Sequence, residues 1–184
     1  MGRRAFVRDR ILNAAFDLFA RRGYEAVPTR DIAVAAKVGA ASMFKHFATK
    51  EQLGRELYAL ALAPIEREFA ALAASSPTPA AALGAAVEIL YRMYDQRPRA
   101  LALLVFPPHD FTPWEVDRAN PKSVRAVLQR LTGQDDDGAA VLWGAITGPL
   151  GDRYLRRRDG LMAPQAAAHA RRILPLLQPS ENTP

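Results

Sequence analysis

The sequence predicts an all-α protein, and two observations support this prediction. Alanine, leucine and arginine dominate the 184-residue chain while β-branched residues are scarce, so helix propensity is high along nearly its whole length. No segment shows the period-two alternation of apolar and polar residues that is typical of a half-buried strand. We therefore expect about nine helices, arranged as a small N-terminal head and a larger helical body.

The first helix of the head is expected over about residues 4–22. Leu12, Phe16 and Phe19 recur at the spacing of one helix face and form an apolar stripe. Gly23 follows as a left-handed cap. Four arginines at the start of the chain are expected to form a solvated arm: Arg3, Arg4, Arg8 and Arg10.

Two short helices are expected next, joined by a tight turn. The first opens at Pro28-Thr29, where Thr29 is a good cap, and the second covers about residues 39–46. A pair of helices this small cannot bury its own faces. Its usual purpose is to present one helix to another molecule.

The body is expected over residues 56–178, with a frayed tail at 179–184. A helix begins at a capping box formed by Thr49 and Gln52 and continues to Pro64, where we expect a kink or a restart. Further helices are predicted over about the following ranges: 80–96, 98–106, 122–131, 136–158 and 163–177. Four prolines in 107–121 predict an irregular connection, and three aspartates at 135–137 favour a helix start there.

The positive charge lies almost entirely on the head. Residues 1–55 hold 11 Lys and Arg against 5 Asp and Glu, whereas residues 56–184 hold 14 against 14. The net charge of +6 therefore belongs to the segment with the helix pair, which indicates phosphate binding. The chain has no Cys, and no apolar run reaches the ~20 residues that span a bilayer. We expect a cytoplasmic protein.

Residues 4–55 resemble the DNA-binding head of TetR-family transcriptional regulators. The resemblance rests on the run ILNAAFDLFARRGYEAV, then TRDIA, then Val38 in the turn, and finally MFKHF followed by TKEQL. It implies a helix-turn-helix domain with a recognition helix at about 39–46, a body that binds a small effector, and a dimer made by the last two helices. The implied function is a ligand-responsive repressor of transcription that binds a palindromic operator.

The turn before the recognition helix departs from the family pattern. The family usually has glycine where this chain has Lys37, serine or threonine at Gly39, a basic residue at Ala40 and an aromatic residue at Lys45. A lysine held at positive φ costs about 1–2 kcal/mol. Either Lys37 accepts this cost, or the bend shifts to Gly39 and moves the helix start.

If the third helix enters the major groove, the residues that contact DNA lie on it and on the helix starts beside it. They are Thr29, Arg30, Ala40, Ala41, Ser42, Phe44, Lys45, His46 and Lys50. Arg30 is the candidate for a base contact, most naturally guanine, and Lys50 for a phosphate contact at a helix N-terminus. Arg30 and Lys45 have the alternative of ordinary surface residues, His46 of packing against a helix, and Phe44 of core.

Two further sites are predicted in the body. Aromatic and polar residues are candidates to line an effector pocket, with plain core as the alternative: Tyr91, Tyr94, Phe106, His109, Phe111, Trp114 and Trp143. Small and apolar residues on the last two helices are candidates for a dimer interface, with packing within one chain as the alternative: Ala140, Gly144, Gly148, Gly151, Ala166, Ala170, Ile173 and Leu177.

Two other function classes remain open on the sequence. The first is a DNA-binding protein that tolerates many sequences and responds to no effector, because Ala40 and Ala41 offer few hydrogen bonds to bases. The second is a small helical enzyme, although no phosphate loop or nucleophile elbow is present. We predict that the chain is not an enzyme and holds no metal or cofactor. Its predicted partners are double-stranded DNA, a second copy of itself and an unknown small molecule, with no membrane.

Overall fold

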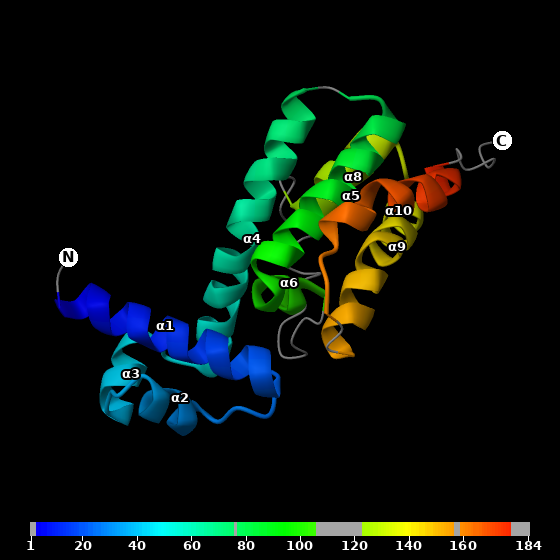
Figure 1. Ribbon diagram of the computed structural model, residues 1–184. Coiled ribbons are helices and arrows are strands. Elements are labelled where there is room, and N and C mark those ends of the chain that lie inside the picture. The colour runs from blue at the N-terminus through cyan, green and yellow to red at the C-terminus, as the bar shows by residue number, and fades with distance from the viewer. Residues whose placement is uncertain (1–2, 76, 106–122, 157–158, 178–184) are drawn as a thin grey trace.

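The computed structural model describes residues 3–75, 77–105, 123–156 and 159–177, and all regular structure within them is helical. In chain order the elements are α1 (Arg3–Arg22), α2 (Thr29–Ala35), α3 (Ala40–His46), α4 (Lys50–Ala74), α5 (Pro79–Gln96), α6 (Pro98–Val105), α8 (Val124–Thr132), α9 (Asp136–Leu155), the 3-10 helix η1 (Ala163–Gln165), α10 (Ala166–Ile173) and the 3-10 helix η2 (Leu174–Leu177). The all-α prediction is confirmed (Figure 1). The predicted connection at 107–121 and the tail at 179–184 lie outside the described residues.

Helices α1, α2 and α3 form a head at one end of the molecule, and α4 leads from it into the body (Figure 1). The head closes over a small apolar core. Its buried side chains come from all three helices and from the α1–α2 loop: Ile11, Phe19, Tyr24, Val27, Ile32, Met43 and Phe47. Phe16 of the predicted apolar stripe and Val38 of the turn before α3 are only partly buried against it.

The N-terminus of α2 differs from the prediction by one residue. Pro28 occupies the capping position and Thr29 is the first helical residue, so the Thr29 side chain makes no capping hydrogen bond. The Asp31 amide instead donates to the Pro28 carbonyl at 3.1 Å. A proline fixes the extended backbone that a capping residue needs, which explains why it takes this position.

The turn between α2 and α3 bends at Lys37, which lies at positive φ. Lys37 has φ of 52°, whereas Gly39 is extended with φ of −71° and caps α3. The bend therefore does not shift, and α3 begins at Ala40. Arg10 of α1 stabilises the turn, because its guanidinium donates to the carbonyl oxygens of Ala36 and, at 3.0 Å, of Lys37.

The prediction of a solvated arginine arm is wrong for two of its members. Arg8 forms an ion pair with Glu56 of α4, and its guanidinium lies 5.3 Å from the centre of the Phe47 ring. Arg10 holds the turn after α2. Both side chains therefore brace the head internally, which leaves fewer free cations at the start of α1 than the sequence suggests.

Helix α4 begins as predicted and continues further. The Thr49 hydroxyl accepts from the Gln52 amide at 3.0 Å, and the Gln52 side chain accepts from the Ala48 amide at 2.8 Å. The helix then runs unbroken through Pro64, so the predicted restart does not occur. Proline removes the hydrogen bond to the carbonyl of Leu60, and Leu60 lies on the exposed face, where water can replace it.

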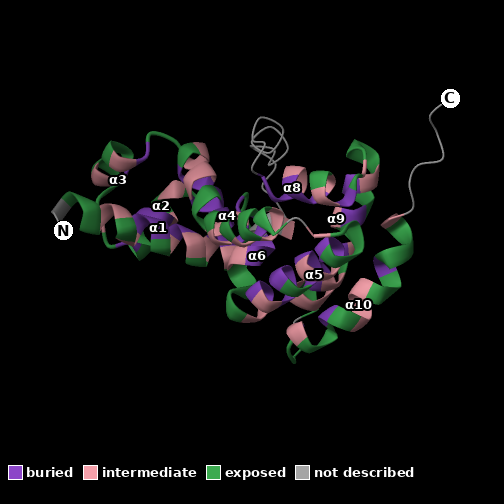
Figure 2. Cartoon of the chain, turned by 90° about the horizontal axis from the view of Figure 1, so that it is seen from above, coloured by how far each residue is buried: buried purple, intermediate pink, exposed green. Residues whose placement is uncertain are grey.

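Helix α5 is the centre of the body. It contacts α4, α6, α8, α9 and α10, and half of its residues are buried (Figure 2). The start of α9 follows the predicted aspartate signal, and α8 ends in a glycine cap. Gly133 caps α8 with φ of 69°, and Asp135 caps α9 by accepting from the Gly138 amide at 2.8 Å.

The last predicted helix, 163–177, is α-helical only in its middle. It opens with a 3-10 turn, η1, and ends in another, η2. Pro175 lacks the amide that would continue the α-helical ladder, which favours the tighter form at that end. Within the described residues, no helix combines the length and apolar character needed to cross a membrane.

Replacing Lys37 with glycine should stabilise the protein. Glycine adopts positive φ without the steric cost that lysine bears, and we expect the free energy of unfolding to rise by about 0.5–1 kcal/mol in urea denaturation. The matched control is Lys45→Gly, whose site is inside α3. That variant should lose about 1 kcal/mol, and equal effects at the two sites would contradict the assigned strain.

Candidate functional site

Helix α3 presents most of its surface to solvent. Only Met43 within the helix is buried, and the following Phe47 completes its anchor. The remaining residues are exposed or half-exposed, and these include six predicted contact residues: Ala40, Ala41, Ser42, Phe44, Lys45 and His46. The Phe44 side chain is 51% exposed, so its alternative as a core residue is wrong. The helix thus offers a small, mostly smooth face with one aromatic ring and two basic groups.

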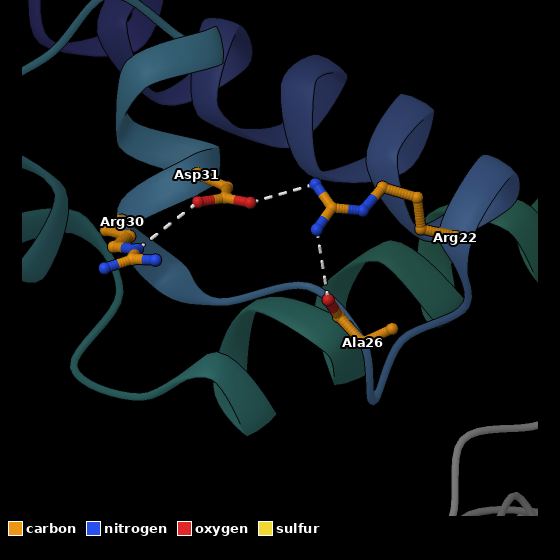
Figure 3. Close-up of polar contacts among 4 residues, drawn as sticks. All are labelled: Arg22, Ala26, Arg30 and Asp31. Atoms are coloured by element: carbon orange, nitrogen blue, oxygen red, sulfur yellow. Dashed lines mark hydrogen bonds and ion pairs between the residues drawn. The ribbon is translucent and has the colours of Figure 1, made fainter.

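The first turn of α2 adds Thr29 and Arg30 beside this helix. The side chain of Arg30 is 86% exposed, and its Nε lies 3.6 Å from one oxygen of Asp31. The other oxygen of Asp31 accepts from Arg22 of α1 at 2.9 Å, and Arg22 also donates to the Ala26 carbonyl at 3.3 Å (Figure 3). Arg22 therefore compensates most of the negative charge of Asp31. The guanidinium of Arg30 remains extended into solvent, where it can contact another molecule.

Arg22 and Asp31 are functional candidates that the sequence analysis missed. They connect the C-terminus of α1 to the start of α2 and so fix the direction from which Arg30 leaves the head (Figure 3). An acidic residue in the first turn of a helix is ordinary, and the sequence shows only that. The pairing with Arg22 depends on how α1 packs over α2, which no local pattern reveals.

Lys50, the predicted phosphate contact, lies at the start of α4 and is half-exposed. Its Nζ is 4.2 Å from the centre of the Tyr24 ring and donates to the Glu25 carbonyl at 3.3 Å. The ammonium therefore bridges the α1–α2 loop and the first turn of α4. Its three hydrogens exceed these contacts, so a donor remains for a phosphate oxygen.

The candidate pocket residues of the body divide into two groups. Tyr91 and Tyr94 of α5 are buried and Trp143 of α9 is partly buried against the core. The others lie outside the described residues: Phe106, His109, Phe111 and Trp114. The structure adds His169 of α10, whose ring stacks on Tyr91 at 5.6 Å. His169 lies four residues before Ile173 and therefore on the same face of the helix. This spacing is the feature of the sequence that could have indicated that His169 faces the core.

Tyr91 has an unusual hydroxyl. The side chain is buried, and its oxygen has no hydrogen-bond partner in the part of the chain that the structure describes. Burial raises the pKa of Tyr91 to about 12, so the hydroxyl stays protonated and available as a donor. Leaving a buried polar group unpaired costs about 1–3 kcal/mol.

Of the residues predicted for the dimer interface, only residues on α9 are accessible to a second subunit. Ala140, Gly144 and Gly148 are exposed, and Val141 and Leu155 extend the same side with 57% and 67% exposed surface. The prediction is wrong for three residues, because they are buried within the subunit: Gly151, Ala166 and Ile173. Ala170 and Leu177 also pack against this core. The stripe on α10 faces α5, so packing within one chain explains it.

Comparison with known proteins agrees with this arrangement. Residues 11–57 match the family model of bacterial regulatory proteins, tetR family. The HTH-type transcriptional repressor Rv3405c of Mycobacterium tuberculosis is 56% identical over 43 residues, which are 23% of this chain and 23% of that protein. The alignment thus spans less than a quarter of the relative's length.

Solved structures are similar over almost the whole chain. A TetR-like transcriptional regulator from Rhodococcus sp. RHA1 has a TM-score of 0.72 at 16% identity, covering 95% of this chain and 98% of that one. The regulator FadR from Bacillus subtilis, in complex with stearoyl-CoA, has a TM-score of 0.68 at 12% identity, covering 89% and 95%. The match in the head and the shared fold of the body agree, and the family comprises regulatory proteins rather than enzymes. Residues 11–57 are therefore similar to the tetR family of bacterial regulatory proteins, and the chain as a whole has the fold of these solved regulators.

Proposed function

We propose that this protein is a ligand-responsive transcriptional repressor that binds a palindromic operator as a homodimer in the cytoplasm. The observation that carries the proposal is the surface made by α3 and the first turn of α2. Its residues are exposed, the domain that holds it bears the net charge of the chain, and Arg30 extends from it with 86% of its side chain exposed. A short exposed helix on a cationic head fits the major groove of DNA.

Within this proposal the contacts have separate roles. Ala40 and Ala41 allow close approach to the bases and contact thymine methyl groups, whereas Arg30 reads guanine through two hydrogen bonds. Lys50 and Lys45 bind phosphates, and so does the Thr29 hydroxyl, which is not used for capping. Affinity then comes mostly from phosphates, and base preference mostly from Arg30.

The dimer is proposed through the exposed face of α9. Val141, Gly144, Gly148 and Leu155 lie on one side of the helix and expose two large apolar side chains to solvent. Both glycines have open space where a Cβ would stand, so another helix can approach closely. Two heads on such a dimer must lie about 34–36 Å apart to enter successive major grooves.

The effector site is proposed beside α5. The unpaired Tyr91 hydroxyl in the body supports it, since an acceptor on a bound molecule would satisfy that donor. FadR, which shares the fold, was solved with stearoyl-CoA, and acyl-CoA is therefore the class of effector to test first. An effector that prefers a body state with the wrong head separation lowers operator affinity, and DNA lowers effector affinity by the same factor.

Selection of bound duplexes from a random pool tests the DNA-binding proposal. We expect a palindrome with half-sites about one helical turn apart, bound at least ~10³-fold more tightly than random DNA at physiological salt. In titrations, Lys50→Ala should weaken all duplexes alike and reduce the salt slope by about one. Arg30→Ala should also relax the preference for one base pair by about 1–3 kcal/mol.

The control for these variants is Arg67→Ala on α4, because Arg67 is exposed and lies about 25 Å along the helix from Lys50. It should leave affinity unchanged. Binding of all sequences with equal strength would favour the alternative of a DNA-binding protein without sequence preference. Loss of affinity in the Arg67 variant alone would contradict the assigned surface.

Tyr91→Phe should raise the stability of the protein without effector and weaken its response to the effector. Without effector, the variant loses an unpaired buried hydroxyl and should gain about 1 kcal/mol in thermal unfolding. With stearoyl-CoA as the probe, release of operator DNA should need a higher concentration than for the unchanged protein. Tyr58→Phe is the control, since Tyr58 on α4 is buried and is not among the candidate pocket residues. Equal behaviour of the two variants would exclude Tyr91 from the site.

Gly148→Leu and Gly144→Leu should produce monomers in sedimentation, with weak operator binding. The space around each Cβ position means that the subunit itself accommodates the larger side chain, while close approach of a second helix is blocked. Ala70→Leu on the exposed side of α4 is the control and should remain dimeric. Dimeric Gly148→Leu protein would show that this face is not the interface.

A further inference from the structure

An open groove lies where the head meets the body, apart from both surfaces described above. Its volume is about 490 Å³, within the range of small-molecule sites. One wall is α1 of the head, and the other is formed by α4 and by the turn from α5 into α6. These elements contact one another around the groove. We call it the junction groove.

The floor of the junction groove is apolar. Leu12 and Phe16 come from α1, and Leu57 and Leu60 come from α4. Leu60 is 54% exposed and Phe16 is only partly buried, so the groove leaves apolar surface in contact with water. An occupant with an apolar part would remove this surface from solvent, which is favourable in proportion to the area covered.

The rim of the groove is cationic at one end. Arg97 and Arg99 line it where α5 ends and α6 begins, and the described lining contains no acidic residue. Arg99 pairs with Asp17 of α1 at 2.8 Å. Arg97 is exposed, and among the residues that the structure describes its guanidinium has no hydrogen-bond or ion-pair partner. One positive charge at this end is therefore uncompensated.

From this juxtaposition we infer that the junction groove binds an amphipathic anion, with its carboxylate on Arg97 and its hydrocarbon part along Leu60 and Phe16. A guanidinium matches a carboxylate with two parallel hydrogen bonds. The first amides of α6, at Arg99 and Ala100, have no partner within their helix and favour negative charge at the same end. The groove is separate from the effector site proposed beside α5, and its described lining does not include Tyr91.

Occupation of the groove would also fix the head against the body. Besides the chain of α4, the described residues join the two through Asp17–Arg99 and through the Tyr154 hydroxyl, which donates to the Ala20 carbonyl at 2.6 Å. An amphipathic anion touches α1 and the start of α6 together. It therefore bridges the same two parts that these contacts hold.

Calorimetric titration of the full chain with decanoate, below its micellar concentration and without DNA, tests this inference. We expect saturable binding of decanoate and binding of decanol that is roughly tenfold weaker, because decanol lacks the charge. Arg97→Gln should weaken decanoate binding by roughly tenfold or more and leave decanol unchanged. Leu60→Glu should abolish binding, because it places a carboxylate on the apolar floor.

Two variants define the site. Arg67→Gln removes an exposed arginine from the same helix as Leu60 and should bind decanoate normally. Tyr91→Phe tests whether the anion occupies the effector site proposed beside α5 instead. Absence of binding, equal binding of decanol, or unchanged affinity in Arg97→Gln would overturn the inference. Loss of binding in Tyr91→Phe would place the anion at the effector site proposed beside α5 and overturn the inference. Because the titration contains no DNA, failure of the proposed repressor function would leave its result intact.

Discussion

The exposed face of α3 exists because the helix is too short to bury more than one anchor. Met43 and Phe47 insert into the core that α1 and the start of α4 provide, and no further turn of the helix remains to pack. Every other side chain of α3 must then face solvent or a partner. The cationic character of the head decides which partner is favoured, since phosphate oxygens compensate charges that the domain leaves unpaired.

Because α2 and α3 are short, the head also depends on stabilising contacts from side chains outside these two helices. Arg10 binds the carbonyls at the turn after α2, Arg8 links α1 to Glu56, and Lys50 holds the α1–α2 loop against α4. Each brace uses a cation, so part of the positive charge stabilises the fold and the rest remains for DNA. The strained Lys37 persists because Arg10 fixes its carbonyl, which is how local strain survives in folded proteins.

Local signals explain which parts of the fold the sequence predicts. The caps at Gly23, Thr49 and Asp135 depend on residues within one turn, and the structure confirms them. Local signals do not predict contacts between residues that are distant in the sequence. The pairing of Arg22 with Asp31 cannot be predicted without knowing how α1 packs on α2. The orientation of α10 cannot be predicted either, because its stripe of Ala166 and Ile173 has the same spacing whether it contacts α5 or a second subunit.

Neutralisation of Asp31 bears directly on how the head can discriminate between sequences. In the proposed complex, Ala40 and Ala41 bring no side-chain hydrogen-bond donors to the groove, so most of the direct base contact is assigned to Arg30. A free carboxylate beside Arg30 would repel the phosphates and compete for the guanidinium. Arg22 at 2.9 Å from Asp31 weakens both effects, while the longer 3.6 Å contact from Arg30 is easily exchanged for a base. In the proposed complex each head makes few base contacts, and a palindrome read by two heads at fixed separation would supply the selectivity that one head lacks.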